Sequence, residues 1–320
     1  MSRELKKKKK RKWPALIFFL ILLGFLIFGF FKIFRSMERS LWDGENQFNL
    51  VINSQPVIVL SFDYQEKTIN LLSIPDGTFV EAIHGFGPYR VESLYKLGEI
   101  KGQGGSLLTG SLQEYFGLNL DGYLTGNQYQ PDKMKIKNFL LNQFFEALRG
   151  RGETNLSRWD SLRIWWQIRK IREDKIIVVD LAQTSASQEV ELPDGSKAMK
   201  IEPERLARII NQFFIDEGFK KEDLTIAVLN KTEHLGLANN VSKIISNIGG
   251  RVVQVGSLLD QVEASGDCEV KSEKKYRNSY TVKKLKQIFD CHWSEGEENE
   301  QRVRILLLVG EDYWAKLNLP

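Results

Sequence analysis

The feature that most constrains this chain is a run of nineteen uncharged residues, Trp13 to Phe31, which directly follows a basic cluster. A helix of this length crosses the ~30 Å hydrocarbon layer of a bilayer. The basic cluster, within residues 1–12, is expected to stay in the cytoplasm by the positive-inside rule. A cleaved signal peptide is the alternative, but its apolar region is normally shorter, and no small-x-small cleavage pattern precedes Trp42. The sequence therefore predicts an uncleaved, single-pass transmembrane helix over residues 13–34, with the remainder extracytoplasmic.

The distribution of charge argues against a nucleic-acid-binding protein. The chain of 320 residues carries a formal net charge of +4. Residues 1–12 hold eight Lys or Arg and one Glu, which is +7, so the other residues sum to −3. A nucleic-acid interface needs basic residues gathered on a folded domain, whereas this basic tail lies beside the predicted membrane helix and suits anionic lipid.

Beyond the predicted helix, the chain is long enough for two α/β domains. Residues 35–47 form a short polar connector, residues 48–220 are rich in predicted strands, and residues 222–320 alternate strands and helices. Within the last region, Leu224 to Ser257 has the pattern of a strand, a polar turn, an amphipathic helix ended by glycines, and a second strand. The full region predicts the order βαββαβ, which is compatible with a split βαβ sandwich.

Three blocks in this last region resemble the C-terminal domain of the LytR-CpsA-Psr (LCP) cell-envelope proteins. They are Val228-Leu229-Asn230-Lys231-Thr232, Gly236-Leu237-Ala238 and Gly249-Gly250-Arg251-Val252-Val253. The family usually has glycine in place of Lys231. The resemblance implies an extracytoplasmic envelope domain without a defined chemistry of its own.

A weaker resemblance covers residues 48–220. Val57 to Phe62, a turn, and Ile69 to Pro75 resemble the opening hairpin of the catalytic LCP domain. The resemblance implies an α/β/α sandwich. The expected fold is therefore a membrane-anchored, LCP-like α/β/α sandwich followed by a small βαββαβ domain.

The sequence departs from the family at the positions that carry its chemistry. Active members transfer a glycopolymer from a polyprenyl-pyrophosphate carrier to peptidoglycan, which requires a metal-binding carboxylate and arginines around two phosphates. The family's Ser-Asp-Thr is Ser54-Gln55-Pro56 here, and its Ile-Pro-Arg-Asp-Thr is Ile74-Pro75-Asp76-Gly77-Thr78. Gln55, Asp76 and Gly77 thus replace the expected first acid, the arginine and the second acid, and the sequence favours a protein without this activity.

Arginines that could bind a phosphate or a lipid headgroup occur in one later segment: Arg149, Arg151, Arg158 and Arg163. Guanidinium groups suit phosphate, and the neighbouring tryptophans suit a membrane interface. The favoured alternative is an amphipathic helix from Ser157 to Arg172 in which Trp159, Leu162 and Trp166 are buried and the arginines are solvated.

The turn before the helix at Leu237 is a candidate anion or sugar site. Asn230, Thr232 and Gly236 lie where the backbone donors of a helix N-terminus point outward. Most helix N-termini bind only water or their own cap, so this prediction rests on the turn alone.

Cys268 and Cys291 are the only cysteines. An extracytoplasmic location favours a disulfide between them. A metal pair with His292 is the alternative, but the spacing is unusual and a fourth ligand is lacking. No metal site and no cofactor are therefore predicted.

These observations predict a non-catalytic binding or scaffold protein that acts in cell-wall or glycopolymer assembly. Its expected partners are the membrane and peptidoglycan, lipid-linked glycan or other envelope proteins, and not nucleic acid. One alternative is a divergent LCP phosphotransferase, the only case that requires Mg²⁺. Another is an envelope-related transcriptional attenuator, a label attached to the family, although no DNA-reading element is found.

Overall fold

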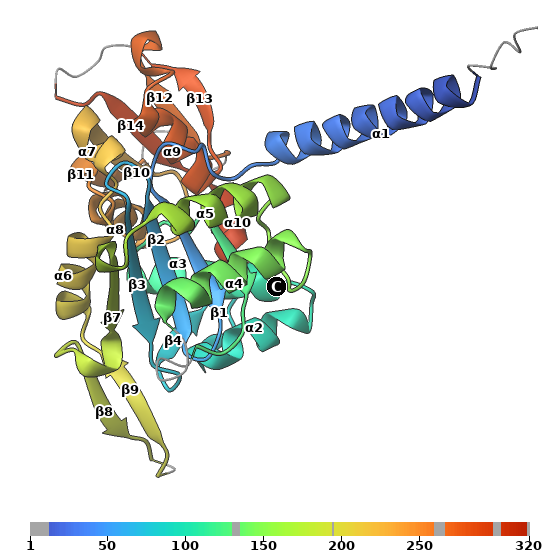
Figure 1. Cartoon of the computed structure of the whole chain (residues 1–320). Coiled ribbons are helices and arrows are strands. Elements are labelled where there is room, and N and C mark those ends of the chain that lie inside the picture. The colour runs from blue at the N-terminus through green and yellow to red at the C-terminus, as the bar shows by residue number, and fades with distance from the viewer. Residues whose placement is uncertain (1–12, 130–134, 194, 259–265, 297–301, 319–320) are drawn as a thin grey trace, which may run out of the picture.

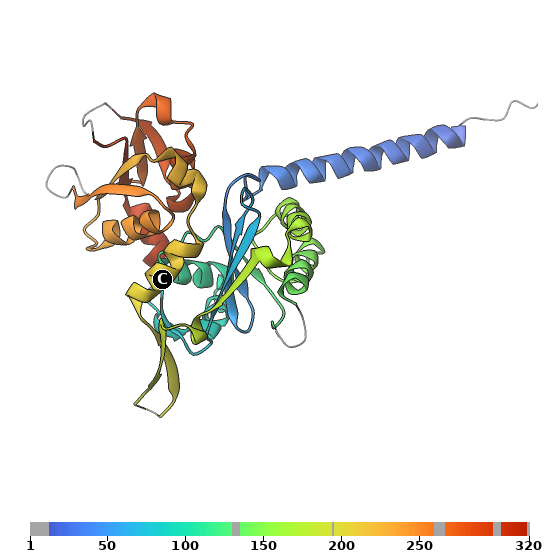
Figure 2. The ribbon, with the colours of Figure 1, turned by 60° about the vertical axis from the view of Figure 1, so that its left-hand side comes forward.

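The computed structural model describes residues 13–129, 135–193, 195–258, 266–296 and 302–318. The predicted basic tail, residues 1–12, lies outside the described residues. The described chain forms two five-stranded sheets with helices around them and one long helix that projects away from both (Figures 1 and 2).

The first sheet is mixed and has the strand order β6-β1-β2-β3-β7. Its strands are β1 (Phe48–Asn53), β2 (Val57–Asp63), β3 (Thr68–Ile74), β6 (Gly122–Thr125) and β7 (Ile176–Asp180). Strands β1 and β3 both run antiparallel to β2, whereas β6 and β7 run parallel to their neighbours. The apolar residues of β1 and β2 are buried on both faces, as a central strand covered by helices requires.

Helices cover both faces of this sheet and form an α/β/α sandwich, as predicted. Side chains of α4 and α5 fill one face together with Leu50, Leu60 and Leu71. Helices α2, α3 and α6 fill the other face, where they pack on Val59 and Leu72. The helix bounds are α2 (Val91–Glu99), α3 (Gly104–Phe116), α4 (Ile136–Leu148), α5 (Arg158–Lys170) and α6 (Pro203–Phe213).

The second sheet differs from the predicted βαββαβ order. Its strand order is β11-β10-β14-β12-β13, with β10 parallel to both β11 and β14, and β12 parallel to β13 but antiparallel to β14. Each βαβ unit therefore pairs its own two strands directly, so the expected split arrangement is wrong. The strands are β10 (Thr225–Asn230), β11 (Arg251–Ser257), β12 (Glu269–Ser272), β13 (His292–Glu295) and β14 (Ile305–Val309).

Strand β13 is the strand that the prediction lacked. Its sequence, His-Trp-Ser-Glu, has no apolar alternation, and parallel pairing with β12 holds it in the sheet. The helices of this unit are α7 (Glu217–Glu222), α8 (Leu237–Asn247), α9 (Tyr280–Phe289) and α10 (Glu311–Asn318).

Smaller elements complete the described chain. Two hairpins stand apart from the sheets: β4 (Phe79–Ala82) with β5 (Gly87–Arg90), and β8 (Ser187–Glu191) with β9 (Lys197–Ile201). Asp194, in the turn of the second hairpin, lies outside the described residues. Three single-turn 3₁₀ helices are η1 (Glu173–Lys175), η2 (Leu181–Gln183) and η3 (Lys274–Tyr276).

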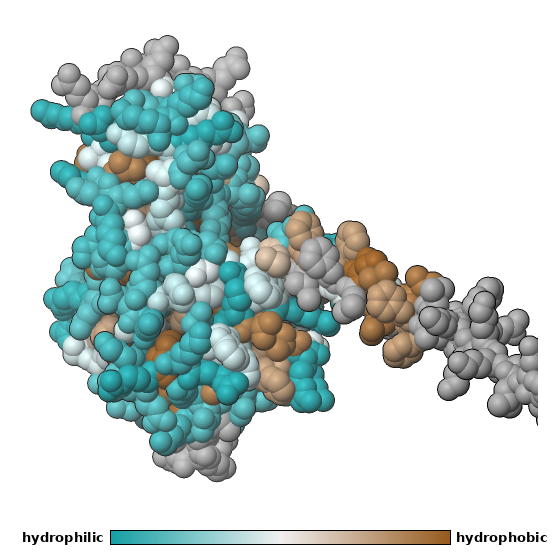
Figure 3. Space-filling model, turned by 45° about the horizontal axis from the view of Figure 1, so that its top comes forward, coloured by the Kyte–Doolittle hydropathy of each residue, from teal (hydrophilic) through white to brown (hydrophobic). Residues whose placement is uncertain are grey.

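The long helix α1 (Trp13–Glu38) contains the whole uncharged run. Among the residues that the structure describes, no helix is both long enough and apolar enough to cross a membrane. The described apolar side chains of α1 are exposed from Phe18 to Leu23 and again at Phe31 (Figure 3).

The connector after α1 was expected to be a polar segment, but it contributes a buried aromatic side chain to the core. Trp42 is 3% exposed and packs edge-on against Phe62, with ring centroids 5.2 Å apart. Its indole N–H donates to the carbonyl of Asn46 at 2.8 Å. The connector is thereby part of the core beneath α5.

The two units contact each other through buried polar groups. Lys284 on α9 forms an ion pair of 3.0 Å with Asp121, which lies just before β6, and these side chains are 7% and 1% exposed. Asn247 on α8 donates to the carbonyl of Gly117 at 2.8 Å.

The chain passes from one core to the other within a few residues. Phe214 belongs to the core of the first unit and Phe219 to the core of the second. Both side chains are buried.

Candidate functional site

The positions at which the LCP resemblance places phosphate chemistry lie at one edge of the first sheet. Strands β1 and β3 end at this edge because both run antiparallel to β2. Gln55 follows β1, and Asp76 and Gly77 follow β3. The amide at Gln55 and the missing side chain at Gly77 leave Asp76 as the one acid of the two family motifs.

Three polar oxygens beside the end of β3 are buried and have no hydrogen-bond partner: Asp76 Oδ1, Thr78 Oγ1 and Glu92 Oε2. The first turn of α2 lies against this segment, because the N–H of Val91 donates to the carbonyl of Thr78 at 2.8 Å. Orphaned buried oxygens are costly in a folded protein. Such a set fits a hard cation such as Mg²⁺, which prefers oxygen ligands and keeps several waters.

Burial raises the pKa of both carboxyl groups. Desolvation is the cause at Asp76. Desolvation is also the main cause at Glu92, and the negative charge of Asp76 adds to it. The described residues nevertheless contain no group of three His, Cys, Asp or Glu side chains placed to hold a metal.

Thr78 and Glu92 were not among the residues singled out from the sequence. A signal for α2 was present, since Val91, Leu94 and Gly98 recur at helical spacing and are buried. Helix α2 brings Glu92 to Asp76, and no sequence pattern indicates that approach.

Arg90, a cation whose charge acts on Glu92, has contacts of its own on another element. Arg90 reduces the rise in the pKa of Glu92. Its guanidinium, however, donates to the carbonyl of Lys197 at 3.3 Å and lies over the ring of Phe79. Arg90 thus joins β5 to the β8–β9 hairpin.

Two of the four predicted arginines pair with a glutamate on α4. The Nη1 atoms of Arg149 and Arg151 lie 3.8 Å and 3.2 Å from the carboxylate of Glu146. Arg149 also lies over the ring of Phe145. Both arginines are exposed at the end of α4, so they form a surface ion-pair group.

Arg163 has a structural partner. Its Nη2 lies 3.1 Å from Asp160 Oδ1, and Asp160 is fully buried. In the capping box of α5, the same carboxylate accepts the backbone N–H of Ser157. It also accepts the N–H of Leu41 at 3.0 Å. The guanidinium also donates to the carbonyl of Trp42 and lies over its ring. Arg163 therefore fastens α5 to the connector.

The exposed face of α5 is not the one that the sequence favoured. The buried side chains are Asp160, Ser161, Ile164 and Ile168. Leu162 and Trp166 are 38% and 50% exposed. The prediction of a buried Trp159–Leu162–Trp166 stripe is wrong. The side chains that face the sheet are instead Asp160, Ile164 and Ile168, which recur every four residues.

Arg158, unlike the other three arginines, has no ion pair with the residues that the structure describes, and its Nη2 lies near Gly150, between Arg149 and Arg151. It lines a surface hollow of about 900 Å³ between the last turns of α1 and the residues that precede α5. The hollow also contacts Lys32, Arg35 and Arg39. Of the basic residues that line the hollow, only Arg158 was predicted from the sequence to bind a phosphate or a lipid headgroup.

The side chains of the turn at Asn230 are used within the turn. Asn230 Oδ1 accepts from the N–H of Thr232 at 2.9 Å, and its amide donates to the carbonyl of His234 at 2.8 Å. Asn230 and Thr232 are buried, and Gly236 has a φ of 84°. Anion or sugar binding at this turn stays a prediction.

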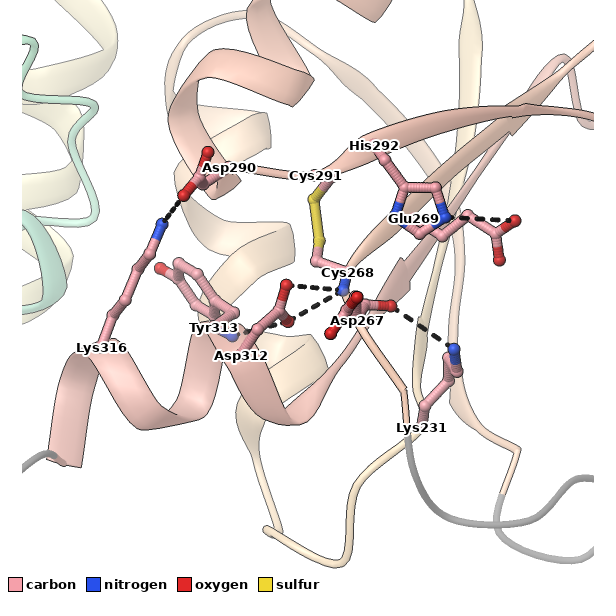
Figure 4. The surroundings of a disulfide bond; sticks show 10 residues. All are labelled: Lys231, Asp267, Cys268, Glu269, Asp290, Cys291, His292, Asp312, Tyr313 and Lys316. Carbon is pink, nitrogen blue, oxygen red and sulfur yellow. Dashed lines mark hydrogen bonds and ion pairs between the residues drawn. A yellow bond between two sulfur atoms is a disulfide. The ribbon is translucent and has the colours of Figure 1, made fainter.

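The structure contains the Cys268–Cys291 disulfide, with Cα atoms 4.6 Å apart. It joins the residue before β12 to the residue before β13 (Figure 4). His292 points to Glu269 at 3.8 Å, and the N–H of Cys268 donates to Asp312 at 2.8 Å. The two sulfurs are bonded to each other, which leaves no thiolate for the alternative metal pair.

No protein family's sequence profile matches this chain. No curated protein matches it in sequence either.

Solved structures of the LytR-CPS2A-psr family are similar to part of the chain. Bacillus subtilis TagT has 14% sequence identity and a TM-score of 0.38, covering 52% of this chain and 89% of its own. A structure of YwtF (TagT) with bound octaprenyl pyrophosphate lipid has 15% identity and a TM-score of 0.38, with coverages of 52% and 89%. The B. subtilis protein described as putative transcriptional regulator ywtF has 12% identity and a TM-score of 0.41, with coverages of 65% and 93%. The structural neighbours of this chain are thus LCP proteins of low identity, matched over little more than half of it in most cases.

Proposed function

We propose that this protein is a membrane-anchored, extracytoplasmic binding or scaffold protein of the cell envelope that acts without transferring phosphate. The observation that carries the proposal is the placement of the arginines. Arg149 and Arg151 pair with Glu146, and Arg163 pairs with Asp160. A diphosphate requires several uncommitted guanidinium groups that converge on it.

The packing of the first unit also supports a scaffold. Apolar side chains from two sets of helices fill both faces of its sheet. A carrier enzyme needs an apolar cavity large enough for its lipid chain. The hollow that Arg158 lines lies outside this core, against α1.

The proposed location rests on the first forty residues and on the cysteines. Basic residues precede the uncharged run, which is the pattern of a helix with a cytoplasmic N-terminus. The exposed apolar side chains of α1 suit lipid better than water. A disulfide in the second unit suits an oxidising compartment outside the membrane.

Retention on cell-wall material tests the proposal. The full chain, held in lipid nanodiscs, is expected to be retained on purified peptidoglycan that carries its glycopolymer, or to capture lipid-linked glycan in the same discs, without releasing the carrier. The control is an unrelated acidic domain on the same kind of membrane anchor. Equal retention of the two proteins contradicts a binding role, and release of polyprenyl pyrophosphate or phosphate contradicts a non-catalytic one.

The unpartnered oxygens near β3 favour one second candidate, a divergent phosphotransferase. Asp76, Thr78 and Glu92 would hold Mg²⁺, which neutralises phosphate charge when bound. The exposed ends of Arg149 and Arg151 would have to leave Glu146 to reach a substrate. This rearrangement is why the binding role is preferred.

The substitution Asp76→Asn separates the two candidate functions when melting is measured first without and then with Mg²⁺. Because burial raises the pKa of Asp76, its ionised form destabilises the fold at neutral pH, and this cost vanishes as the pH falls below the unfolded-state value. Without a bound metal, the variant is expected to melt at a higher temperature than the natural protein at pH 7, with the gap closing towards pH 4. The exposed Asp174→Asn serves as the matched control and should show no such gap.

Added Mg²⁺ gives the second readout of the same samples. A binding protein without a metal site is expected to keep its melting temperature when Mg²⁺ replaces an equal ionic strength of Na⁺. A rise in the natural protein that Asp76→Asn abolishes supports the phosphotransferase instead.

A further inference from the structure

A basic hollow lies where α1 meets the first unit. Its walls are the last two turns of α1 and residues 155–158, and it encloses about 900 Å³. We propose that this hollow binds the headgroup of an anionic phospholipid of the membrane that holds α1. The inference rests on the proposed membrane attachment and adds a specific lipid site to it.

Charge favours an anion in this hollow. Its walls contain the four cations Lys32, Arg35, Arg39 and Arg158 against the single carboxylate of Glu38. None of these four cations forms an ion pair with another described residue, whereas the other three predicted arginines all do. An anionic phosphate that approaches the hollow therefore meets positive charge that the protein has not neutralised.

The apolar part of the hollow suits a lipid rather than a free phosphate. Phe31 and Phe34 line it and are 66% and 50% exposed. The exposed apolar surface continues along α1 towards Phe18 (Figure 3). An acyl chain can lie along this surface while its phosphate contacts the arginines.

The position of the hollow along α1 matches the level of the headgroups. Lys32 is the first charged residue after the uncharged run. Nineteen residues of α-helix span roughly 28 Å, which is close to the thickness of the hydrocarbon layer. If the run is in the bilayer, the cations begin where the lipid phosphates lie.

Contacts between α1 and α5 hold the two walls together. The N–H of Trp159 donates to Ser36 Oγ at 3.1 Å. Arg158 is the neighbouring residue and belongs to the folded unit, whereas Lys32 and Arg35 belong to α1. A headgroup bound by both walls would link the membrane helix to the body and fix the angle between them.

Native mass spectrometry of the full chain in neutral detergent tests the site. Phosphatidylglycerol is expected to remain bound in preference to phosphatidylcholine, which has a similar size but no net charge. The double variant Arg35→Gln/Arg158→Gln is expected to lose phosphatidylglycerol affinity by about twenty-five-fold, because each cation near a lipid phosphate contributes roughly fivefold. Neither side chain takes part in the fold through a hydrogen bond or ion pair, so the variant should fold.

The control replaces two exposed arginines outside the hollow, Arg172→Gln/Arg208→Gln, and is expected to bind lipid as the natural protein does. Equal retention of the two lipids, or the same affinity in the Arg35→Gln/Arg158→Gln variant, overturns the inference. Displacement of the lipid by an equal concentration of inorganic phosphate overturns it too, since it would show a site for free phosphate.

Extraction of cell membranes with alkaline carbonate separates this inference from the proposed function. Both double variants should remain in the membrane with the natural protein. Release of the natural protein contradicts the anchor itself. Retention of every variant together with unchanged lipid preference contradicts the headgroup site alone.

Discussion

Replacing Lys284 by methionine is expected to lower the free energy of unfolding by about 3–5 kcal/mol, the usual cost of removing one partner of a buried ion pair. Lys284 lies 3.0 Å from Asp121, and both side chains are almost fully buried. Burial raises the pKa of the nearby Asp216, and the charge of Lys284 opposes that rise. Methionine would therefore leave buried carboxylates at the contact between the two units without a cation. Urea unfolding at pH 7 measures the loss.

Lys283→Met is the matched control, because Lys283 is the adjacent residue on α9 and is exposed. It should change stability by less than about 0.5 kcal/mol. Adding Asp121→Asn to Lys284→Met is expected to recover part of the loss, since the amide oxygen can still accept the N–H of Asn49. Equal stability of the two lysine variants would show that the ion pair contributes nothing to the contact.

Removal of the disulfide has the second largest expected effect. The bond joins residues 23 positions apart, and opening such a loop costs about 3 kcal/mol in the chain-entropy description. The double variant Cys268→Ala/Cys291→Ala should unfold at correspondingly lower urea concentration.

The effect of reductant provides the control for this second prediction. Reductant should bring the natural protein close to the double variant while leaving the variant unchanged. A natural protein that is as stable with reductant as without it contradicts the predicted contribution. The buried sulfur of Cys268 must become accessible for this reaction, so the reductant is added during unfolding.

The sequence indicated those elements whose side chains show a pattern of their own. Strand β2 is a continuous apolar run because helices cover both of its faces. The helix predicted from Ser157 begins as α5 there, where Ser157 and Asp160 form a capping box. Strand β13 has no such pattern, since its pairing with β12 and the disulfide beside it determine its conformation.

The environment of the site residues was harder to predict than the elements that carry them. Arg149 and Arg163 are chemically identical in the sequence, but one lies on the surface beside Glu146 and the other fastens the connector through Asp160. The difference comes from contacts between segments more than a hundred residues apart, such as that of Leu41 with Asp160. Glu92 was missed for the same reason, because α2 brings it to Asp76.

The short passage between Phe214 and Phe219 has a mechanical consequence. With one phenylalanine embedded in each hydrophobic core, the chain has no slack that could act as a hinge or tether. Helix α9 also touches the connector directly, since Gln287 donates to the carbonyl of Leu41 at 3.2 Å. A pull on the second unit is therefore transmitted to the base of α1 through packed side chains, and the load reaches the helix without first stretching a linker.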